Sequence, residues 1–268
     1  MLIIRYIDYY SSILLSIENE LNNSCNFTTA HYIQTLKNYK NTHSFSFFDN
    51  CSSNDVILRH DIDFSLHDAL RIAKIDNKIG IRSTYFVLLH SELYNPFGYI
   101  SSKLILEILK LGHKIGLHYD EIFFEQTGTD ISTGIEIEID LLKQHFNTDV
   151  DVVTRHNPSV RGKKIPIKLP SGVVDAMSGK YTVERKYLSD SVQYWRENCF
   201  CNHQDNFQEL QITTHPALWT DEGLSRSEIL PRILKNLKNF NEKQIQDNSA
   251  LWERYVEDRI KEKNNKQT

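Results

Sequence analysis

Acidic and histidine side chains recur where apolar runs of this sequence end. In RHDIDFS, Asp61 and Asp63 stand at i and i+2, a spacing that points both carboxylates to one face of a strand. Two such carboxylates are costly to bury unless they share a proton or hold a metal. The segment GLHYD repeats the spacing with His118 and Asp120. A solvated pair of surface acids and a histidine satisfied within the core are the alternatives for these two motifs.

Two further histidines follow the same pattern. His156 in RHNP and His215 in THP come at the ends of the apolar runs VDVV and LQIT. If these runs are parallel strands, the four clusters meet at the carboxyl edge of the sheet, where active sites of α/β folds form. Asp and His suit a borderline divalent cation such as zinc, while a second carboxylate and histidine can supply the base and acid of a hydrolysis. The set predicts metal-assisted hydrolysis.

The elements that must position these residues alternate between strands and helices. Strands are predicted over four apolar runs, at 56–61, 83–89, 113–120 and 150–158. Of the helices between them, the first has Ser65 as its N-cap and Gly80 as its end, the second spans 101–112 with its own serine cap, and the third spans 132–146. Repeated βα units of this length predict parallel strands joined by right-handed crossovers, in an open sheet or a closed barrel.

Length and composition bound the class of protein. The 268 residues include 31 Lys and Arg against 35 Asp and Glu, a net charge of −4 that excludes a nucleic-acid binder acting through a general basic field. With 40% hydrophobic residues, the chain should bury a sizeable core. No stretch reaches the ~18 uncharged apolar residues of a membrane span. The N-terminus lacks the pattern of a signal peptide, and four unevenly spaced cysteines favour a reducing compartment, so we expect a cytoplasmic protein.

The same patterns divide the chain into three stretches that together form one structural domain. We expect an N-terminal helical extension over 1–54, a βα body over 55–222 and C-terminal helices over 223–268. The last stretch has an apolar stripe at helical spacing, formed by Ile229, Leu230, Ile233, Leu234, Leu237 and Phe240. This stripe is expected to pack on the body, with self-association into a homo-oligomer as the alternative.

The order of the motifs resembles a known family. HDID, TYF, GHKIGLH, an R-x-x-P segment and THP, spread between about Val56 and Trp219, resemble the NodB-homology polysaccharide deacetylases, especially the deacetylase-like proteins of bacterial surface-polysaccharide (O-antigen or capsule) gene clusters. The resemblance implies an α/β fold, a distorted (β/α) barrel of about seven parallel strands. The flanking segments are then N- and C-terminal helical additions to this barrel.

The resemblance also implies roles for individual residues. Asp61 looks like the general base of the family and Asp63 like its metal-ligating carboxylate, with Zn²⁺ as the expected cation. His118 resembles the first metal histidine, and His215 the late histidine that protonates the leaving amine. The family's second metal histidine falls at Ile122, which cannot bind a metal.

The residue that replaces this ligand is left with two candidates. We expect His156 to supply it from a neighbouring strand, with Asp120 as the alternative. Arg155, Asp190 and Trp219 are further candidates, either for contact with substrate or for support of the site. For Trp219 the two interpretations are stacking on a sugar ring and burial in the core.

The implied activity is removal of an N-acetyl group from an acetamido sugar, free or as a nucleotide- or lipid-linked precursor, in surface-polysaccharide biosynthesis. Ile122 motivates a different hypothesis, a catalytically altered carbohydrate-binding or assembly protein, and hydrolysis of another linear amide or an ester is a third. Separately, CFCNHQ places Cys199, Cys201 and His203 at C-x-C-x-H spacing, which is poor evidence for a structural zinc site without a second half.

Overall fold

The computed structural model describes residues 25–157 and 167–265. By its internal contacts the chain divides into two compact units, Met1–Leu224 and Ser225–Thr268. All strands of the described residues belong to the first unit. The helices expected within 1–24 lie outside the described residues.

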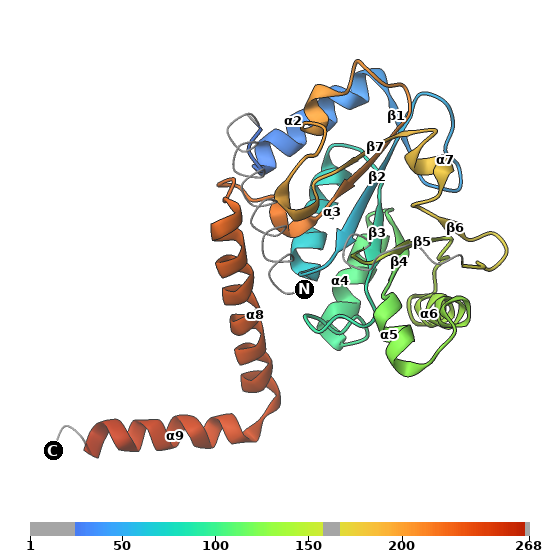
Figure 1. Cartoon of the computed structure of the whole chain (residues 1–268). Coiled ribbons are helices and arrows are strands. Elements are labelled where there is room, and N and C mark those ends of the chain that lie inside the picture. Colours follow the sequence, from blue (N-terminus) through green and yellow to red (C-terminus); the bar gives the residue numbers. More distant parts are fainter. Residues whose placement is uncertain (1–24, 158–166, 266–268) are drawn as a thin grey trace, which may run out of the picture. The chain divides into compact units, whose positions relative to one another are not determined.

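A curled sheet of parallel strands forms the body of the first unit (Figure 1). Its strand order is β6-β5-β4-β3-β2-β8-β7, and the short β1 pairs with the start of β2. This half-barrel, with helices around it, confirms the distorted (β/α) barrel of about seven parallel strands. The strands are β1 (Ser44–Ser46), β2 (Asp55–Ile62), β3 (Thr84–Val87), β4 (Lys114–Tyr119), β5 (Val152–Arg155), β6 (Val174–Asp175), β7 (Lys186–Ser189) and β8 (Leu210–Thr214).

Helices connect most of these strands. The first helix after β2 has the predicted cap, because the Ser65 side chain accepts a hydrogen bond from the backbone N–H of Asp68. Gly80 follows its end with φ of 72°, a left-handed conformation that glycine adopts without strain. The α-helices that the structure describes in this unit are α2 (Thr29–Thr42), α3 (Leu66–Lys78), α4 (Tyr99–Lys110), α5 (Glu121–Thr127), α6 (Ile131–Phe146) and α7 (Gly179–Thr182).

Two local predictions differ from the structure. Helix α4 begins at Tyr99 with Gly98 as its N-cap, so the serine cap expected at the start of 101–112 is wrong, and Ser101 lies buried in the first turn. The reason is the preceding turn, closed by a hydrogen bond from the Gly98 N–H to the Asn95 carbonyl, which carries the chain into the helix early. Strand β1 lies within 1–54, a stretch expected to be helical.

The pleat of the sheet separates a helix-facing core from an inner face. Tyr85 and Val87 belong to a large apolar cluster shared with α3, α4 and α6. Ile57, Phe86 and Val152 belong to a separate cluster on the inner face. Because side chains two apart share a face, the residues that follow Ile57 at even spacing along β2 also face inward.

The described residues of the second unit form two helices. Helix α8 (Arg226–Asn248) begins with a capping box between Ser225 and Glu228, and α9 (Ala250–Asn265) follows it. Within the apolar stripe, Ile229 and Ile233 are buried, whereas Leu230 and Leu234 are exposed. No helix among the described residues combines the length and apolar character that a membrane crossing requires.

Candidate metal centre and active site

The candidate residues gather at the carboxyl edge of the sheet. Asp61 is near the end of β2, His118 is near the end of β4, and Asp63, His156 and His215 come just after β2, β5 and β8. Parallel pairing aligns these ends, because β2 lies between β3 and β8, and β4 lies between β3 and β5. The sheet therefore brings together residues that are far apart in the sequence.

Three of these side chains converge on one point. Asp63, His118 and His156 each offer a ligand atom, and these atoms all lie within 4.8 Å of one another. His118 Nε2 is 3.3 Å from Asp63 Oδ1, and the rings of His118 and His156 meet edge to face with centroids 5.0 Å apart. This is the arrangement expected of three ligands around one cation.

The donor set fits a divalent metal. Among the described residues, the buried Asp63 Oδ1 has no well-directed hydrogen bond, although His118 is close. His118 Nδ1 lies 3.2 Å from the Thr154 carbonyl, to which it donates, and this leaves the Nε2 lone pair directed at the site. One carboxylate and two imidazoles suit zinc, and three protein ligands leave a fourth position for water or substrate.

Asp61 lies beside the metal candidates and is paired to a buried arginine that the sequence analysis did not single out. Arg59 Nη2 donates to Asp61 Oδ2 at 2.7 Å, and both side chains are buried. Burial acts to raise the pKa of Asp61, but the charges of Arg59 and then His118 outweigh it and hold that pKa below its ordinary value. Asp61 Oδ1 is buried and accepts no hydrogen bond within the described part of the chain. Asp61 is thus an ionised carboxylate with a free acceptor atom.

His215 faces the same point from β8. Its Nε2 is 3.7 Å from Asp63 Oδ2, and its Nδ1 is 2.6 Å from Asp190 Oδ1. Burial acts to lower the pKa of His215, but the charge of Asp190 and the hydrogen bond to it raise that pKa to about 10. His215 is therefore protonated at neutral pH and can donate a proton.

Asp190 and Trp219 support His215 from behind. The Asp190 side chain is fully buried and accepts hydrogen bonds from the backbone N–H of His215 and from Trp219 Nε1, the latter at 2.8 Å. Trp219 is also fully buried and packs against Tyr32 with ring centroids 5.2 Å apart. It has no exposed ring face for a sugar, so its contact with the site passes through Asp190.

Asp120 and Arg155 lie at the other side of the metal candidates. Asp120 Oδ1 caps α5 by accepting from the Ile122 N–H at 3.0 Å, and its Oδ2 is 3.9 Å from His156 Nδ1. Arg155 is buried and forms an ion pair with Glu121. Asp120 thus lies next to His156, while the three converging ligand atoms come from other residues.

Partial exposure leaves the site accessible from solvent. The Asp63 and His156 side chains are 17% and 15% exposed, whereas that of His118 is 3% exposed. A substrate can therefore reach Asp63 and His156 from solvent, whereas His118 is buried behind them.

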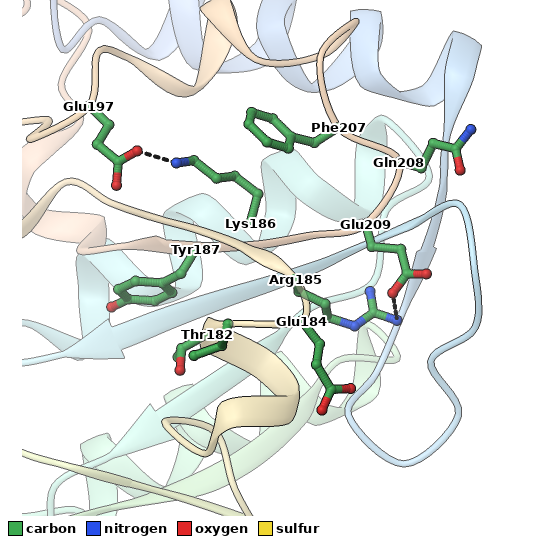
Figure 2. Close-up of a pocket in the computed structure, with 10 residues that line it drawn as sticks. Thr182, Glu184, Arg185, Lys186, Tyr187, Glu197, Phe207, Gln208 and Glu209 are labelled. Atoms are coloured by element: carbon green, nitrogen blue, oxygen red, sulfur yellow. Dashed lines mark hydrogen bonds and ion pairs between the residues drawn. The ribbon is translucent and has the colours of Figure 1, made fainter.

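A separate cavity of about 580 Å³ lies elsewhere, at the amino ends of β7 and β8 (Figure 2). It contains two ion pairs, Lys186 with Glu197 and Arg185 with Glu209. Apart from Glu197, its lining residues either precede β7 and β8 or begin β7, while the acid and histidine clusters follow strands. The cavity is therefore at the opposite edge of the sheet and has no part in the candidate centre.

Comparisons with known proteins give structural neighbours only. No protein-family model matches the sequence, and no curated protein matches it. A CE4 family pseudoenzyme from Bacillus anthracis is 14% identical, with a TM-score of 0.41 over 71% of this chain and 62% of that one. A family 4 carbohydrate esterase from Bacillus anthracis is 14% identical, with a TM-score of 0.36 over 81% and 90% of the two chains. The peptidoglycan deacetylase PdaC from Bacillus subtilis is 15% identical, with a TM-score of 0.36 over 74% and 98%.

These neighbours are CE4 family proteins, an esterase and a deacetylase among them, together with a pseudoenzyme of that family. The chain spans less than two thirds of the pseudoenzyme's length. At such identities and TM-scores the matches describe a general arrangement of strands and helices, so the function of this chain has to be argued from its own side chains.

Proposed function

We propose that this protein is a divalent-metal-dependent hydrolase that removes the N-acetyl group from an acetamido sugar. The proposal of metal-assisted hydrolysis rests on one observation: Asp63, His118 and His156 converge between an ionised Asp61 and a protonated His215. The choice of an acetamido sugar rests on the motifs HDID, GHKIGLH and THP and their resemblance to the polysaccharide deacetylases.

Asp63, His118 and His156 would hold the cation. A divalent ion bound there, of which zinc fits the donors best, supplies a Lewis acid that lowers the pKa of water and polarises an amide carbonyl. Asp61 accepts the proton of the attacking water at Oδ1, while its Oδ2 stays bound to Arg59.

His215 donates the proton that the departing sugar nitrogen needs. Its Nδ1 is held by Asp190, which leaves Nε2 directed toward Asp63 and the substrate. The base and the acid therefore approach from β2 and β8, neighbouring strands of the sheet. This separation of roles is the one that hydrolysis of an amide requires.

The test combines metal content with acetate release. In the zinc-loaded protein, Asp63→Ala should lose the metal of this centre, whereas Asp61→Asn should keep it and lower acetate release by at least about 100-fold. The exposed His145 gives a matched control, since His145→Ala should change neither quantity. Full activity in the Asp61→Asn protein would overturn the proposed base.

The identity of the third ligand can be tested separately. His156→Ala should lower the affinity for metal far more than Asp120→Asn, because Asp120 lies beside His156 and outside the three converging atoms. The reverse order of effects would assign the ligand to Asp120.

A second candidate function rests on Ile122, which lies in the first turn of α5 where the resemblance implies a metal histidine. A deacetylase-like protein that binds sugar without hydrolysing it should show sugar affinity by calorimetry that Asp61→Asn and His215→Ala leave unchanged. A panel of acetamido, formamido and O-acetyl sugars would also separate N-deacetylation from hydrolysis of another amide or an ester. A role in surface-polysaccharide synthesis, a nucleotide- or lipid-linked substrate, self-association and a cytoplasmic location stay predictions from the sequence.

A further inference from the structure

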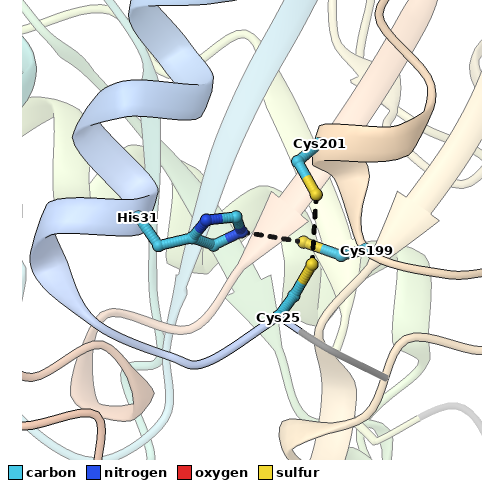
Figure 3. A group of neighbouring side chains, drawn as sticks. All are labelled: Cys25, His31, Cys199 and Cys201. Atoms are coloured by element: carbon cyan, nitrogen blue, oxygen red, sulfur yellow. Dashed lines mark hydrogen bonds between the residues drawn. The ribbon is translucent and has the colours of Figure 1, made fainter. Parts of the chain in front are cut away.

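A second group of metal-ligating side chains lies outside the candidate active site. Cys25 comes just before α2, His31 lies in the first turn of α2, and Cys199 and Cys201 flank Phe200 (Figure 3). The side chains point toward one another, and their four ligand atoms all lie within 4.8 Å. We propose that these four residues form a structural zinc site, distinct from the Asp63 centre.

Two distances within the group are close to the edges of a tetrahedral zinc centre. Cys25 Sγ is 3.1 Å from Cys201 Sγ, and His31 Nε2 is 3.3 Å from Cys199 Sγ. Zinc bonds of ~2.3 Å to sulfur and ~2.0 Å to nitrogen give tetrahedral edges of roughly 3.5–3.8 Å, so small shifts bring all four atoms onto one cation. The Cys25 to Cys201 separation also exceeds the ~2.05 Å of a disulfide.

The ligand set indicates a structural rather than a catalytic zinc. Three thiolates and one imidazole fill all four tetrahedral positions and leave none for water or substrate. Cys199 is fully buried and the other three are half-buried, so the ion would be shielded from solvent. The start of α2 also orients His31, because its backbone N–H donates to Thr28 Oγ1 at 3.1 Å.

The complete set could not be found from the local C-x-C-x-H spacing. His203, the histidine of that spacing, lies apart from the four, and its Nε2 is 2.6 Å from the Glu197 carbonyl oxygen. The second half of the set comes instead from Cys25 and His31, and His31 is 168 residues from Cys199. Only the folded chain brings the two halves together.

A zinc ion here would join α2 to the 199–201 segment across an aromatic cluster. The His31 ring stacks on Trp219 with centroids 6.4 Å apart, and Phe200 meets Trp219 edge to face at 5.8 Å. Tyr39 of α2 also donates to the Phe200 carbonyl at 2.7 Å. The ion would thereby fix the packing around Trp219, whose Nε1 holds Asp190.

The experiment measures zinc per chain by inductively coupled plasma mass spectrometry, after purification with zinc. In an Asp63→Ala background, which removes the active-site metal, we expect one equivalent of zinc, and loss of that equivalent on adding Cys199→Ser or His31→Asn. Two matched controls, Cys51→Ser and His203→Asn, should keep it, since both residues lie outside the cluster. Because this background lacks the Asp63 ligand, the result does not depend on the proposed deacetylase centre.

A second measurement needs no substitution and so cannot fail through misfolding. With Co²⁺ bound in place of zinc, the unaltered chain should show intense thiolate-to-cobalt charge-transfer absorption, which an oxygen and nitrogen centre such as Asp63 with two histidines does not give. Absence of that absorption would overturn the proposal. So would zinc retained in the Cys199→Ser protein, or a disulfide between Cys25 and Cys201 in protein purified without reductant.

Discussion

The imidazole of His215 is held by Asp190, with 2.6 Å between Nδ1 and Oδ1. The carboxylate is fully buried and also accepts from Trp219 Nε1, so it cannot turn away from the ring. Its negative charge is the main reason that the pKa of His215 lies at about 10 in spite of burial. The orientation and the proton affinity of the proposed acid thus depend on a residue that is itself buried.

Replacing Asp190 by Asn removes that charge while keeping the shape of the side chain. The pKa of His215 should fall. Because His215 must be protonated to act, the alkaline limb of the pH profile, where activity is lost, should shift to lower pH. We expect acetate release at pH 9 to drop by about 10-fold or more, with a smaller loss at pH 6. Asp205→Asn, at an exposed aspartate, is the control, and an unshifted alkaline limb would contradict the role of Asp190.

The pair of Arg59 and Asp61 predicts a shift of the acidic limb. Arg59→Met leaves the buried Asp61 without its counter-charge, so the pKa of Asp61 should rise. The acidic limb of the pH profile should therefore shift to higher pH. Arg59→Lys keeps a positive charge and should shift the limb less. Circular dichroism establishes folding first, because breaking a buried ion pair costs about 3–5 kcal/mol. Identical acidic limbs in the two variants would show that the charge is not what sets the pKa of Asp61.

The positions of the candidate residues at strand ends could be predicted because the sequence patterns that mark strand ends are local. An apolar run followed by an acid or a histidine marks a strand end, and parallel pairing places such ends at one edge. Asp63, His118 and His156 converge for that reason.

Partners from distant segments could not be predicted in this way. The strand end before Asp190 made it a candidate for contact with substrate or support of the site but did not identify His215 as its partner, and nothing near Cys199 points to His31. Arg59 is the intermediate case, since its i−2 spacing from Asp61 places both on the inner face of β2. Its burial beside Asp61, however, depends on the cover that Gln211 and Phe86 give it.

A buried carboxylate on the helix side of the sheet predicts a large stability effect. Asp76 is fully buried and accepts from the hydroxyls of Tyr32, Ser83 and Tyr85, and it pairs with His60 Nε2 at 2.9 Å. Asp76→Ala leaves these donors without an acceptor, so the free energy of unfolding should fall by about 3–5 kcal/mol in urea denaturation.

The control for this substitution is Asp140→Ala, on the exposed face of α6, which should change the free energy of unfolding by less than about 0.5 kcal/mol. A loss below about 1 kcal/mol for Asp76→Ala would mean that the hydroxyls find water or other acceptors in the variant.

His113 is a histidine that folding keeps neutral. His113 is 3% exposed, its Nδ1 accepts from the Ser83 N–H at 3.2 Å, and its Nε2 donates to the Ala73 carbonyl at 2.9 Å. Both nitrogens are therefore occupied as in the neutral ring. Burial, outweighing the charge of Asp76, lowers the pKa of His113 below its ordinary 6.5.

Because the unfolded chain binds a proton at His113 below about pH 6.5 and the folded chain does not, its contribution to stability is complete above that pH and is lost as the pH falls. The limiting slope is about 1.4 kcal/mol per pH unit for one proton. His113→Gln should reduce the overall stability and flatten the decline in the free energy of unfolding between pH 6.5 and 5, measured by urea denaturation. His145→Gln, at an exposed histidine, should leave the slope unchanged. An equally steep decline in the His113→Gln protein would mean that other groups take up the proton.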